Sequence, residues 1–178
     1  MQLFRRTRCR DSAVSLYNII VAQSRKPAYY VYCDVPDTID GRFDMIVLHA
    51  FFVLRRLKVR HRKTAQALLE VIFDDMDRSL REMGAGDLGV SRRVKTMARA
   101  LYGRIATYER ALDGDGTALA EALRRNLYGT IDPDPQCVEA MLTYVRAEAA
   151  SVEQQSLDRI AVGSLTFGPP PNAGQRAM

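Results

Sequence analysis

The sequence is poor in the residues that build metal and cofactor sites, with three cysteines and two histidines among 178 residues. Cys9, Cys33 and Cys137 are scattered and form no Cys-x-x-Cys pair, which argues against a disulfide framework or a zinc site and fits a reducing compartment. The chain also has no Walker A loop, no His-Glu-x-x-His pair and no Gly-x-Ser-x-Gly elbow. We therefore expect no catalytic residues, no cofactor and no metal.

Long apolar runs are missing as well. The most apolar stretch, from Phe43 to Leu54, has ten apolar residues in twelve and is interrupted by Asp44 and His49. A membrane-spanning helix needs about 20 such residues, so this stretch predicts a buried central helix instead. The N-terminus, MQLFRRTRCRDSAVSLYNII, is basic but lacks the continuous apolar region of a secretory signal. We expect a cytoplasmic protein that could lie peripherally at the inner face of the cytoplasmic membrane.

Positive charge is concentrated in the first half of the chain. Residues 1–99 hold 19 lysines and arginines against 11 acidic residues, whereas residues 100–178 hold 7 against 10. This imbalance indicates an anionic partner such as RNA, a ribosome, a membrane surface or an acidic protein, and a solvated surface is the alternative. The densest cluster, RRLKVRHRK (55–63), fits phosphate or headgroup contacts and equally fits a charged helix terminus.

Apolar residues recur at helical spacing along most of the chain. They predict helices that start at Asp11 or Ser12 and then cover about Asp40–Arg60, Lys63–Met83, Arg92–Leu112, Thr117–Tyr128 and Gln136–Ser156. With no strand pattern and no internal repeat, the sequence predicts an all-α, single-domain bundle of about six or seven helices. A flexible basic segment (1–10) is expected before the helical domain (11–167), and a disordered tail rich in proline and glycine (168–178) after it.

Two groups of residues allow chemical alternatives. His49 lies on the apolar stretch, where an imidazole could ligate haem iron, although a hydrogen-bonded core histidine is the more common case. Asp74, Asp75 and Asp77 could form a metal or acid–base site, but Arg78 and Arg81 follow at helical spacing and favour ion pairs. No Glu-x-x-His motif accompanies these carboxylates, as a metal site in a helical bundle would require. Structural roles are therefore favoured for both groups.

Several blocks of sequence together carry a family resemblance. They are LYNIIVAQSRKPAYY (16–30), VPDTIDGRFDMIVLHAFFVLRRL (35–57), FDDMDRSLREMGAGDLGVSRRVKTMARALYGR (73–104) and the pair YGR and YERAL within 102–112. This pattern resembles the ubiquinol–cytochrome c chaperone family, the assembly factors of the cytochrome bc1 complex (respiratory complex III), over about residues 11–150. The short N-terminus and the arginine-rich composition favour the bacterial branch.

The resemblance implies an all-helical, non-enzymatic chaperone that binds newly made cytochrome b near the ribosome and the inner membrane, with a small protein partner. Such a function needs aromatic contact area and positive charge, so the expected partner-binding residues are Tyr29, Tyr30, Tyr32, Arg42, Asp44, Arg55, Arg56, Lys58, Arg60 and Arg62. Packing of the tyrosines over the core is the alternative. The competing functions are a basic helical module that binds RNA or the ribosome, and a haem-binding helical protein.

Overall fold

The computed structural model describes residues 2–82 and 87–172. Within these ranges the chain forms no strand and eight helices: α1 (Gln2–Ser24), α2 (Ala28–Tyr32), α3 (Ile39–Leu57), α4 (Arg62–Glu82), α5 (Asp87–Leu112), α6 (Gly116–Asn126), α7 (Pro135–Gln154) and α8 (Leu157–Ala161). Six helices are long, whereas α2 and α8 have five residues each. The predicted all-α fold is confirmed.

The most apolar helix, α3, forms the centre of the molecule. It begins where the side chain of Thr38 accepts a hydrogen bond from the backbone N–H of Gly41, which caps the helix. Every residue from Val47 to Leu54 is buried, because α1, α4, α5, α7 and α8 all pack against α3. Within the described ranges, none of the helices combines the length and the hydropathy needed to cross a membrane. The central position predicted for this stretch is confirmed.

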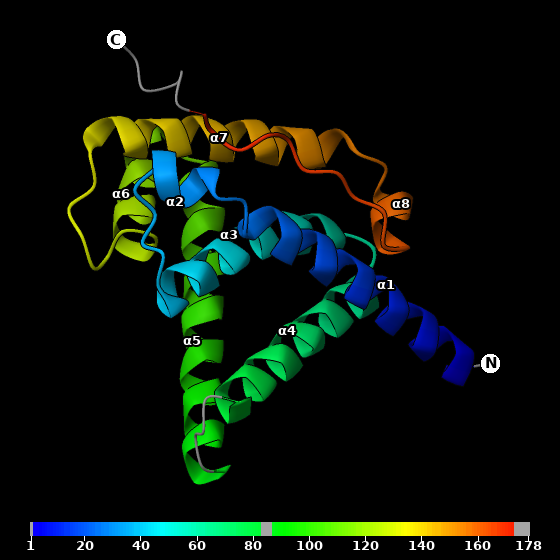
Figure 1. The fold of residues 1–178 in the computed structure, drawn as a ribbon. Coiled ribbons are helices and arrows are strands. Elements are labelled where there is room, and N and C mark those ends of the chain that lie inside the picture. Colours follow the sequence, from blue (N-terminus) through cyan, green and yellow to red (C-terminus); the bar gives the residue numbers. More distant parts are fainter. Residues whose placement is uncertain (1, 83–86, 173–178) are drawn as a thin grey trace.

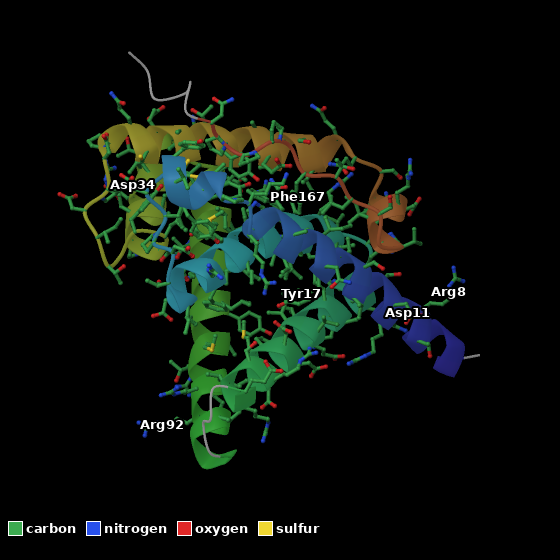
Figure 2. The ribbon with its side chains drawn as sticks, viewed as in Figure 1. Arg8, Asp11, Tyr17, Asp34, Arg92 and Phe167 are labelled. Atoms are coloured by element: carbon green, nitrogen blue, oxygen red, sulfur yellow. The ribbon has the colours of Figure 1, made fainter. Side chains whose placement is uncertain are left out.

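The long helices cross one another at steep angles (Figure 1). Helix α5 stands nearly upright in this view, α7 lies across its upper end, and α4 slants from the lower end of α5 towards α1. The segment after α8 runs back along α7, and Phe167 on this segment lies beside α1 (Figure 2).

Two glycines permit close approaches between backbone segments. A Cβ atom at Gly41 would collide with the carbonyl oxygen of Pro36, so the turn before α3 closes only with glycine at this position. Gly163 follows α8 with a φ of 94°, and a Cβ there would lie 2.9 Å from Cβ of Ser15 on α1. Glycine is therefore required where α3 begins and where α8 ends against α1.

The structure corrects three predicted boundaries. Helix α1 begins at Gln2 rather than at Asp11 or Ser12, so residues 2–10 are helical, and the flexibility expected of segment 1–10 stays a prediction. Helix α5 begins at Asp87, ahead of the predicted start at Arg92. The predicted start of the tail shifts beyond Gly168, because Gly168 donates its N–H to Glu148 Oε2 at 2.9 Å, and disorder of the remaining tail stays a prediction. Residues 173–178 lie outside the described ranges.

Candidate functional site

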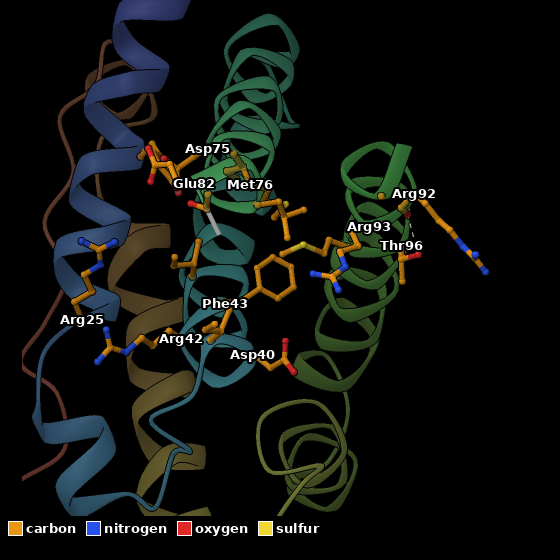
Figure 3. Close-up of a pocket in the computed structure, with 18 residues that line it drawn as sticks. Arg25, Asp40, Arg42, Phe43, Asp75, Met76, Glu82, Arg92, Arg93 and Thr96 are labelled. Carbon is orange, nitrogen blue, oxygen red and sulfur yellow. Dashed lines mark hydrogen bonds between the residues drawn. The ribbon is translucent and has the colours of Figure 1, made fainter. Parts of the chain in front are cut away.

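An open groove lies between α1, α3, α4 and α5 (Figure 3). Its volume of about 990 Å³ is at the upper end of the roughly 300–1,000 Å³ typical of ligand pockets. Phe43 projects from α3 into the space in front of α5, between the four helices. The groove is therefore the candidate binding site of this chain.

The floor of the groove consists of two apolar stripes. Helix α3 contributes Ile39, Phe43 and Ile46, and α4 contributes Ile72, Met76 and Leu80, with Met97 of α5 completing the lining. Residues three or four positions apart lie on one face of a helix, so each stripe is a direct result of its sequence spacing. Ile39 is 66% exposed, which leaves apolar surface open at the mouth. The arrangement suits an apolar occupant.

Charged side chains surround this apolar floor. Arg25 and Arg42 lie on the side of α1 and α3, and Arg92 and Arg93 lie on α5 (Figure 3). The carboxylates of the lining are those of Asp40, Asp75 and Glu82. Because both signs are present, the rim can meet polar ends of an apolar segment without repelling either charge.

One wall of the groove is fixed by a hydrogen bond between α1 and α4. The hydroxyl of Tyr17 donates to Asp75 Oδ2 at 2.7 Å, and Asp75 also pairs with Arg78 at 3.2 Å. Burial raises the pKa of Tyr17, and the neighbouring Asp75 raises it further. The phenol therefore stays protonated and remains a donor, which holds the two helices together beside the groove.

The three tyrosines of the predicted aromatic surface have different positions. The Tyr29 side chain is fully buried, which corrects its expected contact with a partner. Tyr30 is half-buried and donates its hydroxyl to the carbonyl oxygen of Ser24 at 2.7 Å. Tyr32 is 38% exposed, so of the three it alone presents a large accessible surface. The packing alternative therefore applies to Tyr29.

The basic residues of the predicted cluster divide into paired and unpaired side chains. Arg55 lies 3.0 Å from Asp113, Lys58 lies 2.8 Å from Glu109, and Arg56 lies 3.3 Å from Glu153. These bonds attach the end of α3 to α5 and to α7, which is the structural role expected of charges at a helix terminus. Arg60 and Arg62 are exposed and form no ion pair with another described residue. Their partner-binding role stays a prediction.

The two polar residues at the start of α3 also separate. Arg42 is exposed at the rim of the groove, where its Nε lies 2.6 Å from Asp37 Oδ1. Asp44 is buried and pairs with Arg104 of α5 at 2.9 Å, so its expected role as a surface residue is corrected. Burial raises the pKa of Asp44 to about 6, although the charge of Arg104 opposes the rise. The partner-binding role of Arg42 stays a prediction, and Asp44 joins two helices behind the groove.

His49 belongs to a buried chain of hydrogen bonds. Its Nδ1 lies 2.8 Å from the carbonyl oxygen of Met45, which can only accept, so this nitrogen carries the proton. Its Nε2 then accepts from the hydroxyl of Tyr144 at 2.8 Å. Tyr29 donates to Tyr144 at 2.7 Å, and Gln23 donates to Tyr29 at 2.7 Å.

The hydrogen-bond donors around His49 favour the neutral form of its imidazole. Burial lowers the pKa of His49 to about 4, and a proton on Nε2 would replace the acceptor that Tyr144 needs. Both ring nitrogens are thus engaged with protein atoms inside the core. His49 has the structural role favoured by the sequence, and haem ligation would require this network to open.

The acidic set on α4 forms ion pairs. Asp74 lies 2.9 Å from Arg10 of α1, Asp75 pairs with Arg78, and Asp77 lies 2.7 Å from Arg81. No group of three or more potential metal ligands occurs among the described residues. The ion pairing expected of these carboxylates is confirmed by the three contacts to arginine.

The groove itself was not predicted as a site. Phe43, Met76 and Met97 follow the same spacing as core residues, so the sequence assigns them to the interior.

Residues 84–89 carry the spacing Gly-x-Gly-x-x-Gly, which follows a strand in dinucleotide-binding proteins. Here α4 ends at Glu82 before this motif, so its context does not match a nucleotide site. The mixture of apolar and charged residues around Ile39 was a clearer sign of the groove in the sequence.

The structure is that of an all-helical protein with an open groove. The model of the ubiquinol-cytochrome C chaperone family matches residues 31–167. The chain is similar to the crystal structure of the Cbp3 homolog from Brucella abortus, with a TM-score of 0.81 and 36% identity, over 94% of this chain and 96% of that one. This chain belongs to the ubiquinol-cytochrome C chaperone family.

Curated relatives are more distant in sequence. The chain is 24% identical over 162 residues to the Xenopus laevis ubiquinol-cytochrome-c reductase complex assembly factor 1, covering 89% of this chain and 81% of that protein. It is 23% identical to the human protein of the same name, again over 89% of this chain but only 54% of the human protein. The chain thus spans about half the length of its human relative.

Proposed function

We propose that this chain is a non-enzymatic assembly chaperone that binds newly made cytochrome b and assists assembly of the ubiquinol-cytochrome c reductase (bc1) complex. The observation that carries the proposal is the open apolar groove between α3, α4 and α5 in a member of this family. The names of the relatives describe assembly of the same complex. A membrane protein held before assembly exposes apolar segments, and an apolar groove is the surface that such segments require.

The groove suits one face of an apolar helix. Helix-in-groove recognition uses anchor residues at steps of three and four, which match the stripes on α3 and α4. Met76 and Met97 are flexible and polarizable, so they adapt to different client side chains. The charged rim, with Arg42 and Arg93, meets the polar ends of the bound segment.

Site-specific crosslinking tests the position of the client. A photoreactive amino acid replaces Ile39 or Met97 in the groove, and the same amino acid at the exposed Thr143 of α7 is the control. After irradiation in membranes of the source organism, we expect cytochrome b adducts from the groove positions and few from the control. Adducts from Thr143 with none from the groove would place the client elsewhere.

A genetic experiment tests the function itself. Deletion of the gene should reduce the levels of cytochrome b and of assembled bc1 complex, and the wild-type gene should restore both. The variant Ile39→Asp should restore them poorly because it places a charge on the open part of the apolar floor. Ile131→Asp, at a half-exposed isoleucine outside the groove, is the matched control. Normal bc1 levels in the deletion strain would refute the proposal.

A further inference from the structure

A second hollow lies at the opposite end of α3 from the groove mouth. It has a volume of about 1,060 Å³ and is formed by the outer part of α1, the turn between α3 and α4, and α8. Arg8 and Asp11 project from this part of α1 (Figure 2). We call this surface the basic edge, and its lining residues on the turn and at the start of α4 are Val59, Arg60, His61, Arg62, Lys63 and Thr64.

Cations predominate on the basic edge. Arg8, Arg60, Arg62 and Lys63 are exposed, and none of them forms an ion pair with another residue in the described part of the chain. The carboxylates are those of Asp11 and Asp158, and Asp158 lies 3.3 Å from Nε2 of His61. Four unpaired cations in one hollow create a positive potential that attracts an anionic surface.

Two valines stand among these cations. Val59 on the turn is 62% exposed, and Val162 after α8 is 63% exposed. Both are short apolar side chains, and their transfer out of water lowers the free energy. A surface that combines exposed apolar groups with lysine and arginine matches the boundary between headgroups and acyl chains in a bilayer.

The composition of the edge favours lipid over nucleic acid. Proteins that bind single-stranded nucleic acid stack its bases on aromatic side chains, and among the described residues that line this hollow the only aromatic ring is that of His61, whose Nε2 faces Asp158. Exposed valines add nothing to phosphate contacts, whereas they fit the interface of a membrane. We propose that the basic edge docks the protein on an anionic phospholipid bilayer, with the arginines at the headgroups and Val59 and Val162 at the acyl boundary.

This docking does not depend on the proposed client. The basic edge and the groove use different residues, so a protein anchored through the edge would keep Ile39 and Phe43 free of the lipid contact. Purified full-length protein and synthetic vesicles are therefore sufficient for a test. Failure of the vesicle experiment would leave the client experiments unaffected, and the reverse also holds.

Vesicle cosedimentation provides the test. We expect binding to vesicles of phosphatidylcholine that contain about 30% phosphatidylglycerol. Binding to vesicles of phosphatidylcholine alone should be much weaker. Binding should fall as salt rises from about 50 to 500 mM, since screening weakens the attraction. The double variant Arg60→Gln/Arg62→Gln should bind about 25-fold more weakly, at roughly fivefold for each basic residue.

Matched variants separate position from net charge. Arg99→Gln/Arg124→Gln removes the same charge from exposed sites on α5 and α6 and should leave binding near the wild-type level. Val59→Ser/Val162→Ser should weaken binding on the order of tenfold, with little change in its salt dependence. Thermal melting shows whether each variant is folded. The tests of lipid composition and of salt use the wild-type protein alone, so they do not depend on the folding of any variant.

Three results would overturn the proposal. One is equal binding, or no binding, to both vesicle types. Another is an equal loss of binding in the Arg60/Arg62 variant and in the Arg99/Arg124 control. The last is displacement of the protein from vesicles by a single-stranded RNA oligonucleotide whose binding requires Arg60 and Arg62. That result would assign the edge to nucleic acid.

Discussion

Nε of Arg104 lies 2.9 Å from Oδ1 of Asp44, and the Arg104 guanidinium also stands over the ring of Phe43 at 5.9 Å from its centroid. One side chain of α5 thus contacts both a buried carboxylate and an aromatic residue of the groove floor. The pair holds α5 against α3, and through Phe43 it connects the stability of the core to the shape of the groove.

Asp44 should make the stability of the protein depend on pH. Burial raises the pKa of Asp44 to about 6 in the folded state, so the folded protein binds this proton more tightly than the unfolded chain. The free energy of unfolding should therefore fall as pH rises from about 4 to about 6, by on the order of 2 kcal/mol relative to Asp44→Asn. Urea denaturation of both proteins at several pH values measures the difference.

The control for Asp44 is Asp37→Asn, because Asp37 is exposed and Arg42 lowers its pKa. Asp37→Asn keeps Asp44, so its pH profile should retain the decline of the wild type, whereas Asp44→Asn should lose it. Parallel profiles for the wild type and Asp44→Asn would contradict the role of the buried carboxylate.

His49 should change the pH dependence of stability in the direction opposite to Asp44. Its pKa is lowered to about 4 by burial, so between about pH 4 and 6.5 the unfolded chain binds a proton that the folded protein rejects. The stabilising contribution is complete above pH 6.5 and should be lost as pH falls towards 4, by on the order of 2 kcal/mol. His49→Gln, compared with the wild type by denaturation at several pH values, should lack this loss.

The matched control is His61→Gln, which removes an imidazole that faces Asp158 at the surface. An optical titration with haem adds an independent check on His49. Identical spectra for the wild type and His49→Gln are expected, and a histidine-dependent Soret band would revive the haem-binding alternative.

Gly41 and Gly103 should respond to alanine in opposite ways. Gly41→Ala places a methyl group against the carbonyl of Pro36 and should lower the free energy of unfolding by about 2 kcal/mol or more. Gly103 is an exposed residue inside α5, and no neighbouring side chain lies within 4 Å of the place that a methyl group would take. Gly103→Ala should therefore raise the free energy of unfolding by about 0.5–1 kcal/mol. Thermal and urea denaturation distinguish the two, and equal effects would show that the turn before α3 relaxes.

Gln155 should hold the segment after α8 in place. Its side chain donates to the carbonyl oxygen of Thr166 at 2.8 Å and accepts the Thr166 N–H at 3.0 Å. Gln155→Ala should accelerate hydrogen exchange at Thr166 about tenfold, as expected for loss of about 1–1.5 kcal/mol. Gln154→Ala, at an exposed neighbour, is the control, and equal exchange in both variants would contradict this role.

Much of the fold was predictable because helical spacing is a local property. The apolar stripes of α3, α4 and α7 placed these helices to within a few residues. The start of α1 was missed because residues 2–10 are mostly polar and basic and carry no apolar stripe. Tertiary contacts, such as the pair of Arg10 with Asp74, form outside any local pattern.

The candidate site was harder to predict than the fold. A groove is a place where apolar stripes from different helices face one another without meeting, and spacing along one helix cannot distinguish this from a filled core. Ile46 and Met97 illustrate the difficulty, since both match the core pattern and both line the groove. The charge of Asp44 was equally misleading, because its partner Arg104 lies on α5, far along the chain.

The bond from Gln23 to the carbonyl oxygen of Gly168, 2.9 Å long, joins residues 145 positions apart. During synthesis the first helix leaves the ribosome long before its last partner exists, and contacts between distant parts of a chain form late. The buried chain of Gln23, Tyr29, Tyr144 and His49 can therefore close only after the ribosome has made the chain as far as Tyr144. A protein proposed to hold an unfinished client would itself spend its own synthesis with the centre of its core incomplete.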